Sequence, residues 1–195
     1  MNAEIISVGT ELLLGQVVNT DTTIVARELS ALGINLLYSA VVGDNVDRLK
    51  LAVETAVSRS DLLIMTGGLG PTTDDLTKET TAACAGKKLV LHQESLERIQ
   101  NYFNEKHVSE NQAKQAWLPE GCTVFRNDNG TAPGCAFQAE TGCTIIMLPG
   151  PPSVLEPLLK NCAVPYLKQG QEWVIVSHNV HIYGKGEAPV AQMMD

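Results

Sequence analysis

The chain has 195 residues, a hydrophobic fraction of 44% and a formal net charge of −8 at pH 7. This length and composition suit one globular domain of ordinary size, with at most a small appendage. The acidic balance and an aromatic content of only 5% disfavour a general affinity for nucleic acid. No apolar run has the length of a membrane span, so we expect a cytoplasmic protein that binds neither nucleic acid nor membrane.

Strands and helices alternate along the first sixty residues. Hydrophobic periodicity predicts strands at residues 5–8 and 35–42, a helix from about 21 to 32, and a second helix that begins with Asp44 as its cap. Between the first strand and the first helix lies an apolar loop interrupted by glycine, residues 12–18. We interpret this loop as partly buried or as a contact with a partner subunit.

A third strand, residues 62–65, opens the most unusual segment of the chain. Three glycines and a proline follow it, so the chain must turn and a ligand can approach the backbone closely. Thr72 and Thr73 suit the N-cap of a helix, and Asp74 and Asp75 suit its first turn. Strand, glycine loop and helix together form an arrangement that binds anions. The simpler interpretation, an ordinary turn whose aspartates only cap the helix, stays open.

Two adjacent aspartates beside an anion site create an electrostatic conflict, because carboxylates repel phosphate strongly where water is scarce. A divalent cation between them removes the conflict, and Mg²⁺ typically takes one or two carboxylates together with phosphate oxygens of the substrate. We therefore predict a metal-bridged phosphate site at Asp74 and Asp75. Lys78 lies on the same helical face and is expected either to contact phosphate or to form a surface ion pair.

The second half of the chain continues the alternation with shorter elements. The expected strands are residues 88–91, 123–126, 135–138, 144–148, 173–176 and 180–183, and the expected helices are 93–106, 109–117 and 153–167. Residues 127–134 are rich in turn formers, and their simplest interpretation is a hairpin loop. The five cysteines are odd in number and none forms a C-x-x-C pair, which is typical of reduced cysteines with a packing role.

The pattern as a whole predicts an α/β fold with a mostly parallel sheet and helices on both faces. Ligands of such sheets lie outside the carboxyl ends of the strands. Three unusual loops, residues 9–21, 67–75 and 149–152, all leave the carboxyl ends of expected strands. We therefore expect them to share one edge of the sheet and to form one site.

Four motifs carry a resemblance to a known family. They are Ile5 and residues 7–15 with Asn19-Thr20-Asp21, the loop from Thr66 to Asp75 with Lys78-Glu79, residues 129–134, and Leu148-Pro149-Gly150-Pro151-Pro152. In this order they resemble the N-terminal domain of the CinA family of competence/damage-inducible proteins, which is similar to the molybdopterin-binding fold of the MoaB, MogA and MoeA proteins. The resemblance implies a three-layer, MoaB/MogA-like nucleotide-binding domain over residues 1–170. Residues 171–195 would begin a small following module that is cut short.

The resemblance also implies a metal-dependent nucleotide pyrophosphatase that acts on ADP-ribose or a related diphosphate, with Mg²⁺ or Co²⁺ as cofactor. Asp74 and Asp75 would serve the metal and the diphosphate, Lys78 is a further catalytic candidate, and Asp75 could orient or deprotonate the attacking water. Which aspartate does which stays open. The substrate-binding candidates are Thr66, Gly67, Gly68, Gly70, Thr72, Glu11, Asn19, Asp44, Asn129, Gly130, Thr131, Ala132, Pro133, Gly134, Pro149 and Gly150.

Two other functions remain open, a non-catalytic nucleotide- or molybdopterin-binding module and molybdopterin adenylyl transfer. Leu69 stands where molybdopterin-pathway proteins usually have threonine, which disfavours adenylyl transfer. Besides a nucleotide, we expect a second copy of the chain as partner, because relatives of this fold often self-associate.

Overall fold

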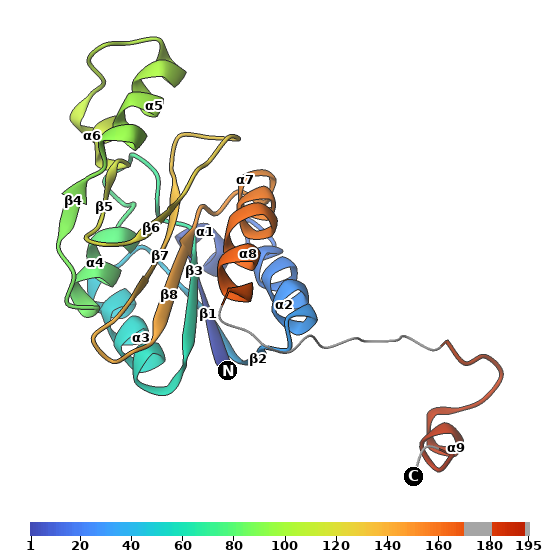
Figure 1. The fold of residues 1–195 in the computed structure, drawn as a ribbon. Coiled ribbons are helices and arrows are strands. Elements are labelled where there is room, and N and C mark those ends of the chain that lie inside the picture. The colour runs from blue at the N-terminus through green and yellow to red at the C-terminus, as the bar shows by residue number, and fades with distance from the viewer. Residues whose placement is uncertain (170–180, 194–195) are drawn as a thin grey trace.

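The computed structural model describes residues 1–169 and 181–193. Its centre is a six-stranded sheet with the order β2-β1-β3-β8-β7-β6 (Figure 1). Four neighbouring strands run parallel, and a hairpin of two antiparallel strands completes the sheet. The parallel strands are β2 (Asn35–Val42), β1 (Asn2–Val8), β3 (Leu62–Thr66) and β8 (Thr144–Leu148), and the hairpin is β7 (Gly134–Gln138) with β6 (Thr123–Phe125). The predicted mostly parallel sheet is confirmed.

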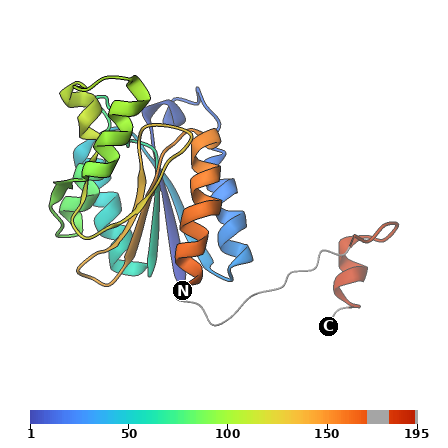
Figure 2. The same cartoon turned by 45° about the horizontal axis from the view of Figure 1, so that its top comes forward.

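Helices cover both faces of the sheet, as Figure 2 shows. One layer contains α2 (Asp21–Ala31) and α7 (Pro152–Leu158), and the other contains α3 (Val46–Arg59) and α4 (Thr77–Cys84). Because successive strand residues point to opposite faces, Ile5 belongs to the core under α2 while Ile6 belongs to the core under α3. The predicted three-layer α/β architecture is therefore confirmed.

The helix that follows β8 is not regular throughout. After α7 it passes through a π-helical turn, Leu159–Ala163, into α8 (Val164–Lys168). Pro157 and Pro165 flank this turn, and neither has an N–H group to donate to the helical ladder. The single helix predicted over residues 153–167 is therefore present, with an interruption that the prolines explain.

A small subdomain lies beside the carboxyl edge of the sheet, at the upper left of Figure 1. It consists of β4 (Leu89–Leu91), α5 (Gln93–Phe103), α6 (Glu110–Lys114) and β5 (Trp117–Pro119), and β4 pairs with β5 in a separate antiparallel sheet. The helix expected over residues 109–117 is shorter than predicted. The observed helix, α6, ends at Lys114, and Trp117 is already the first residue of β5.

Three local predictions around the carboxyl edge are wrong. Thr10–Leu13 forms a short helix, α1, where an apolar loop was expected. Helix α3 is capped by Asn45, whose side chain accepts from Arg48 N at 3.1 Å, while Asp44 accepts from the backbone N–H and hydroxyl of Thr10 at 2.8 Å. Helix α4 begins at Thr77 rather than at Thr72 or Thr73.

The end of the chain tests few of the predictions. The expected strand at 173–176 lies outside the described residues. Residues 181–183, expected to continue a strand, have no regular secondary structure, and a short helix, α9, spans Glu187–Ala191. Within the described ranges, no helix combines the length and the apolar character that crossing a membrane requires.

Candidate functional site

A cavity of about 500 Å³ lies at the carboxyl edge of the parallel strands. Its wall includes the last residues of β1 and β3, Val8 and Thr66, and the turn that follows β8. The three loops predicted to converge, residues 9–21, 67–75 and 149–152, all contribute to it, together with the hairpin between β6 and β7. This volume is ordinary for a site that binds a small ligand.

The glycine loop owes its shape to two left-handed residues. Gly67 and Gly68 have φ angles of 87° and 66°, which side chains other than glycine rarely adopt. A Cβ at Gly67 would overlap the carbonyl oxygen of Val8, and a Cβ at Gly68 would overlap the hydroxyl of Thr77, the first residue of α4. The loop therefore packs tightly onto β1 and onto the N-terminus of α4, although α4 starts later than predicted.

The loop offers an anion fewer backbone N–H groups than the sequence suggested, because two of them already donate within the protein. Gly67 N donates to Leu148 O at 3.0 Å, and Gly70 N donates to Asp75 Oδ1 at 2.9 Å. Within residues 1–169 and 181–193, no partner accepts from the N–H groups of Gly68 and Leu69. Both N–H groups are therefore available to a phosphate oxygen.

Of the two adjacent aspartates, only Asp75 faces the cavity. Its Oδ1 accepts from Gly70 N, and its Oδ2 accepts from Thr72 N at 2.8 Å and from Thr72 Oγ1 at 2.5 Å. These bonds hold residues 70–75 as a separate turn, which is why α4 does not start there. Asp74 is exposed and is not part of the cavity wall.

The predicted metal site at the aspartate pair is thus not preformed. A carboxylate has about four lone-pair positions, so three donors leave Asp75 about one for a metal or a ligand. Among the described residues, no three or more His, Cys, Asp or Glu side chains cluster in a way that could hold a metal ion. Any cation here would depend on oxygen atoms from water and ligand.

Lys78 lies neither on the cavity wall nor on the surface. It is only 2% exposed, and its Nζ donates to the carbonyl oxygen of Lys114 at 2.7 Å. Lys114 in turn donates to Asp75 O at 2.6 Å and to Thr72 O at 3.3 Å. The two lysines therefore tie the loop that carries Asp75 to helix α6. This burial contradicts both roles predicted for Lys78, the phosphate contact and the surface ion pair.

Burial of Lys78 predicts an unusual dependence of stability on pH. Burial lowers the pKa of Lys78 from 10.5 to about 8, so between these values the unfolded chain binds a proton that the folded chain does not. The free energy of unfolding should therefore rise from pH 8 to pH 10.5, by up to about 3 kcal/mol from this group. Urea denaturation of the wild type and of Lys78→Met, which cannot titrate, measures this as a difference between two curves. Parallel curves would contradict it.

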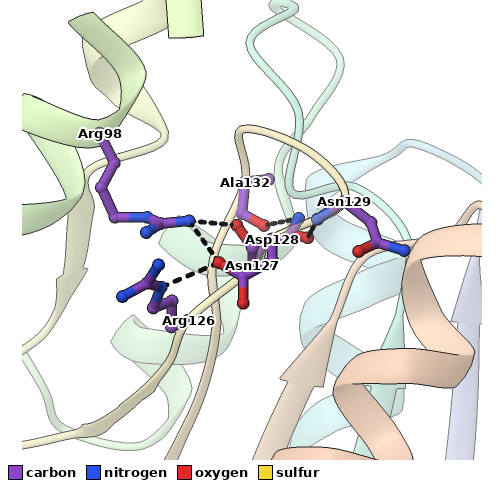
Figure 3. Close-up of polar contacts among 6 residues, drawn as sticks. All are labelled: Arg98, Arg126, Asn127, Asp128, Asn129 and Ala132. Carbon is purple, nitrogen blue, oxygen red and sulfur yellow. Dashed lines mark hydrogen bonds and ion pairs between the residues drawn. The ribbon is translucent and has the colours of Figure 1, made fainter. Parts of the chain in front are cut away.

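The hairpin between β6 and β7 is held by a network of polar contacts, shown in Figure 3. Asn127, which is buried, donates from Nδ2 to Ala132 O at 2.7 Å and accepts at Oδ1 from Asn129 N at 2.9 Å. Arg98 of α5 donates to Asn127 O at 2.7 Å and pairs with Asp128 at 2.9 Å, and Arg126 also pairs with Asp128. The hairpin loop is thus fixed on the small subdomain side of the cavity.

Most of the predicted binding residues lie on the cavity wall. Those present are Thr66, Gly67, Gly68, Gly70, Asp75, Glu11, Asn19, Gly130, Thr131, Ala132, Pro149 and Gly150. Those outside the wall are Asp74, Lys78, Thr72, Asp44, Asn129, Pro133 and Gly134. Asn129 instead donates to Ser153 O at 3.3 Å, and Gly134 is the first residue of β7, close to the carbonyl oxygen of Met147.

The electrostatic character of the cavity is acidic. Three carboxyl side chains line it, Glu11, Asp21 and Asp75, and its wall contains no Lys, Arg or His among the described residues. Burial raises the pKa of Asp21 to about 6, although the neighbouring Thr66 hydroxyl acts in the opposite direction. The side-chain oxygen of Gln115, which is 2% exposed, has no hydrogen-bond partner in the part of the chain that the structure describes.

Sequence reasoning missed Asp21, Gln115 and Asn127 as wall residues. Asp21 was predicted to start a helix at the end of the converging loop 9–21, but its carboxyl was not named as a site residue. Gln115 follows a short helix of the small subdomain, and nothing in its neighbours along the chain points to a ligand. The turn-rich composition around Asn127 was the one signal that could have found a site residue.

Comparisons with known proteins agree with this fold. The family model described as "Probable molybdopterin binding domain" matches residues 4–169. A "CinA-like protein" of Desulfovibrio desulfuricans is 51% identical over 191 residues, which cover 98% of this chain and 45% of that protein. The chain spans about half the length of the curated relatives it matches.

Two solved structures extend the comparison. "The protein CinA with unknown function" from Thermoplasma acidophilum is 36% identical, with a TM-score of 0.78 over 83% of this chain and 95% of that one. The molybdopterin biosynthesis enzyme MoaB of Thermus thermophilus is 18% identical, with a TM-score of 0.59 over 86% of this chain and 92% of that one. The second likeness concerns the fold alone.

Proposed function

Because the chain belongs to the molybdopterin-binding domain family and, within it, to the CinA proteins, we propose that it is a metal-dependent nucleotide pyrophosphatase acting on ADP-ribose or a related diphosphate. The supporting observation is the charge of the cavity. Three carboxyl groups and no basic side chain line it within the described part of the chain, so a diphosphate can enter only together with cations. A neutral ligand would need no such compensation, and the two free N–H groups of the glycine loop favour an anionic one.

The donor set fits a hard divalent cation such as Mg²⁺ or Co²⁺. Mg²⁺ is usually held by one or two carboxylates and keeps several waters and phosphate oxygens, so it needs no larger cluster of protein ligands. Asp75 is the residue that would hold it, through the lone-pair position left free by Gly70 and Thr72. When bound, the cation would neutralise the diphosphate and polarise one of its phosphorus atoms.

The remaining wall residues would position the ligand. The N–H groups of Gly68 and Leu69 would donate to phosphate oxygens, and the buried amide of Gln115 would satisfy its unpaired oxygen with a hydroxyl or water of the bound ligand. The fixed hairpin at Gly130–Ala132 would cover the ligand from the subdomain side. The α1–α2 loop exposes Leu14 and Val18, which supports the expected association of the chain with a second copy of itself.

The activity is tested directly with ADP-ribose. We expect release of AMP and ribose 5-phosphate with Mg²⁺ or Co²⁺, and at least about a 100-fold loss of rate after treatment with EDTA that added metal restores. Chromatography of the products measures both. Tight nucleotide binding by calorimetry that does not require metal, with no AMP released under any metal, would instead identify a binding module. Tight binding of molybdopterin in the same assay would favour adenylyl transfer.

A further inference from the structure

The three carboxyl groups on the cavity wall differ in their surroundings. Asp75 is occupied by the glycine loop, from which it accepts three hydrogen bonds. Glu11 is exposed on α1, with its carboxylate folded against Gly9. Asp21, the first residue of α2, is only 8% exposed and still reaches the cavity wall. It is therefore the carboxyl group that water reaches least and that the loop does not use.

The side chain beside the Asp21 carboxyl is a hydroxyl group, not a cation. Thr66 lies beside its carboxyl, Thr66 Oγ1 donates to Ser7 Oγ at 3.2 Å, and Ser7 Oγ lies 3.5 Å from Thr22 Oγ1. The other titratable groups on the wall are Glu11 and Asp75. The wall residues that come from the turn after β8, from α7 and from the hairpin include no titratable side chain. No positive side chain on this wall, as far as the chain is described, stabilises the ionised form of Asp21.

Building on the proposed function, we propose that Asp21 is the general base that activates the water for hydrolysis of the diphosphate. As the water oxygen bonds to one phosphorus, an Asp21 carboxylate oxygen takes the water proton. The bridging P–O bond breaks, and the leaving phosphate keeps its electron pair. Asp21 then returns the proton to solvent, and no oxidant or reductant is needed.

Burial is what makes this residue suitable as a base. A general base is most efficient when its pKa lies close to the working pH, and burial brings the pKa of Asp21 to about 6. Asp75 is less suitable because about three of its four lone-pair positions accept from Gly70 and Thr72. The two aspartates would thus divide the work, with Asp75 on the loop and metal side and Asp21 on the water side.

The experiment compares the full chain with Asp21→Asn, and uses Asp47→Asn as a matched control at an exposed aspartate of α3. With ADP-ribose and Mg²⁺, kcat of Asp21→Asn should fall by about 100-fold or more, while KM and the calorimetric Kd change by less than about threefold. Wild-type kcat should rise with pH through about 6, and the residual activity of Asp21→Asn should lack this step. Asp47→Asn should match the wild type.

A second readout separates a base from a structural residue. The folded pKa of Asp21 lies above its ordinary value of 3.8, so its contribution to stability is lost as pH rises through about 6. Asp21→Asn should therefore be more stable than the wild type above pH 6, with a gain that shrinks toward pH 4. A structural role predicts a loss at every pH. If Asp21→Asn does not fold, Asp21→Ser carries the same test.

The outcomes also distinguish this inference from the function on which it rests. An active wild type together with an Asp21→Asn variant that keeps the pH step would overturn the role of Asp21 alone. Weakened Mg²⁺ or ADP-ribose binding with unchanged kcat would equally overturn it, because it would make Asp21 a binding residue. A wild type with no turnover in any metal would overturn the pyrophosphatase proposal itself.

Discussion

Gly67→Ala should destabilise the protein by about 4 kcal/mol, because two costs add at this position. The φ angle of 87° requires a left-handed backbone, which costs a residue with a side chain about 1–2 kcal/mol. In addition, the new Cβ would overlap the carbonyl oxygen of Val8. This neighbour is a backbone atom of β1, so it cannot rotate away. Urea denaturation followed by circular dichroism measures the loss.

Gly121→Ala is the matched control for this prediction. Gly121 has a similar φ angle of 74°, but nothing lies within 4 Å of the position that its Cβ would take among the residues that the structure describes. Its substitution should cost only the left-handed backbone term of about 1–2 kcal/mol. Equal losses at the two glycines would mean that the close approach of β1 to the glycine loop has no energetic weight, and would remove the structural reason for glycine at 67.

The parallel sheet was predictable because its signal is local and strong. The strands β1, β3 and β8 are buried on both faces. Residues 62–65 and 145–148 are continuous apolar runs, and a glycine or proline directly follows each of the three strands. The convergence of the three loops followed from a general property of such sheets rather than from the loops themselves. That is why the position of the cavity could be predicted from the order of the elements, without any detail of its side chains.

The wrong predictions for Asp75 and Lys78 have a common physical origin, which is that each side chain forms hydrogen bonds to backbone groups. Helix propensity placed Asp74 and Asp75 in a first turn, but Asp75 bonds to the N–H groups of Gly70 and Thr72 and holds that turn apart from α4. Lys78 was expected either to contact phosphate or to form a surface ion pair, and neither expectation includes burial, because lysines are seldom buried. Its carbonyl partner, Lys114, is 36 residues away, and no local pattern reveals it.

Asp21 shows most clearly which features of the site the sequence could not predict. The sequence predicts Asp21 at the start of a helix, at the end of the converging loop 9–21, but nothing in it singles out the carboxyl group. Its burial depends on the packing of α2 against the sheet beside the glycine loop, which is a property of the tertiary structure. The same holds for Gln115, which reaches the cavity from the small subdomain.

Asp75→Asn should reduce the rate of ADP-ribose hydrolysis by about 10- to 100-fold. Both Asp75 oxygens accept from the loop, so an amide would direct N–H groups at the N–H of Gly70 or of Thr72. The loop would lose shape as well as charge, and the unfolding free energy should fall by about 1–3 kcal/mol. Steady-state kinetics with Mg²⁺ measure the first effect, and the affinity for Mg²⁺ in the presence of ADP-ribose should fall in parallel.

Asp74→Asn removes the same charge one residue away and tests whether the aspartates act as a pair. Asp74 is exposed outside the cavity wall, so its substitution should change stability by no more than about 0.5 kcal/mol and the rate far less than Asp75→Asn does. An equal loss in both variants would show that the loop rearranges to bring Asp74 to the metal when ligand binds, as the sequence alone predicted. A large loss at Asp75 alone would place the cation between that single carboxylate and the diphosphate, because the other cavity carboxyl groups lie on α1 and α2.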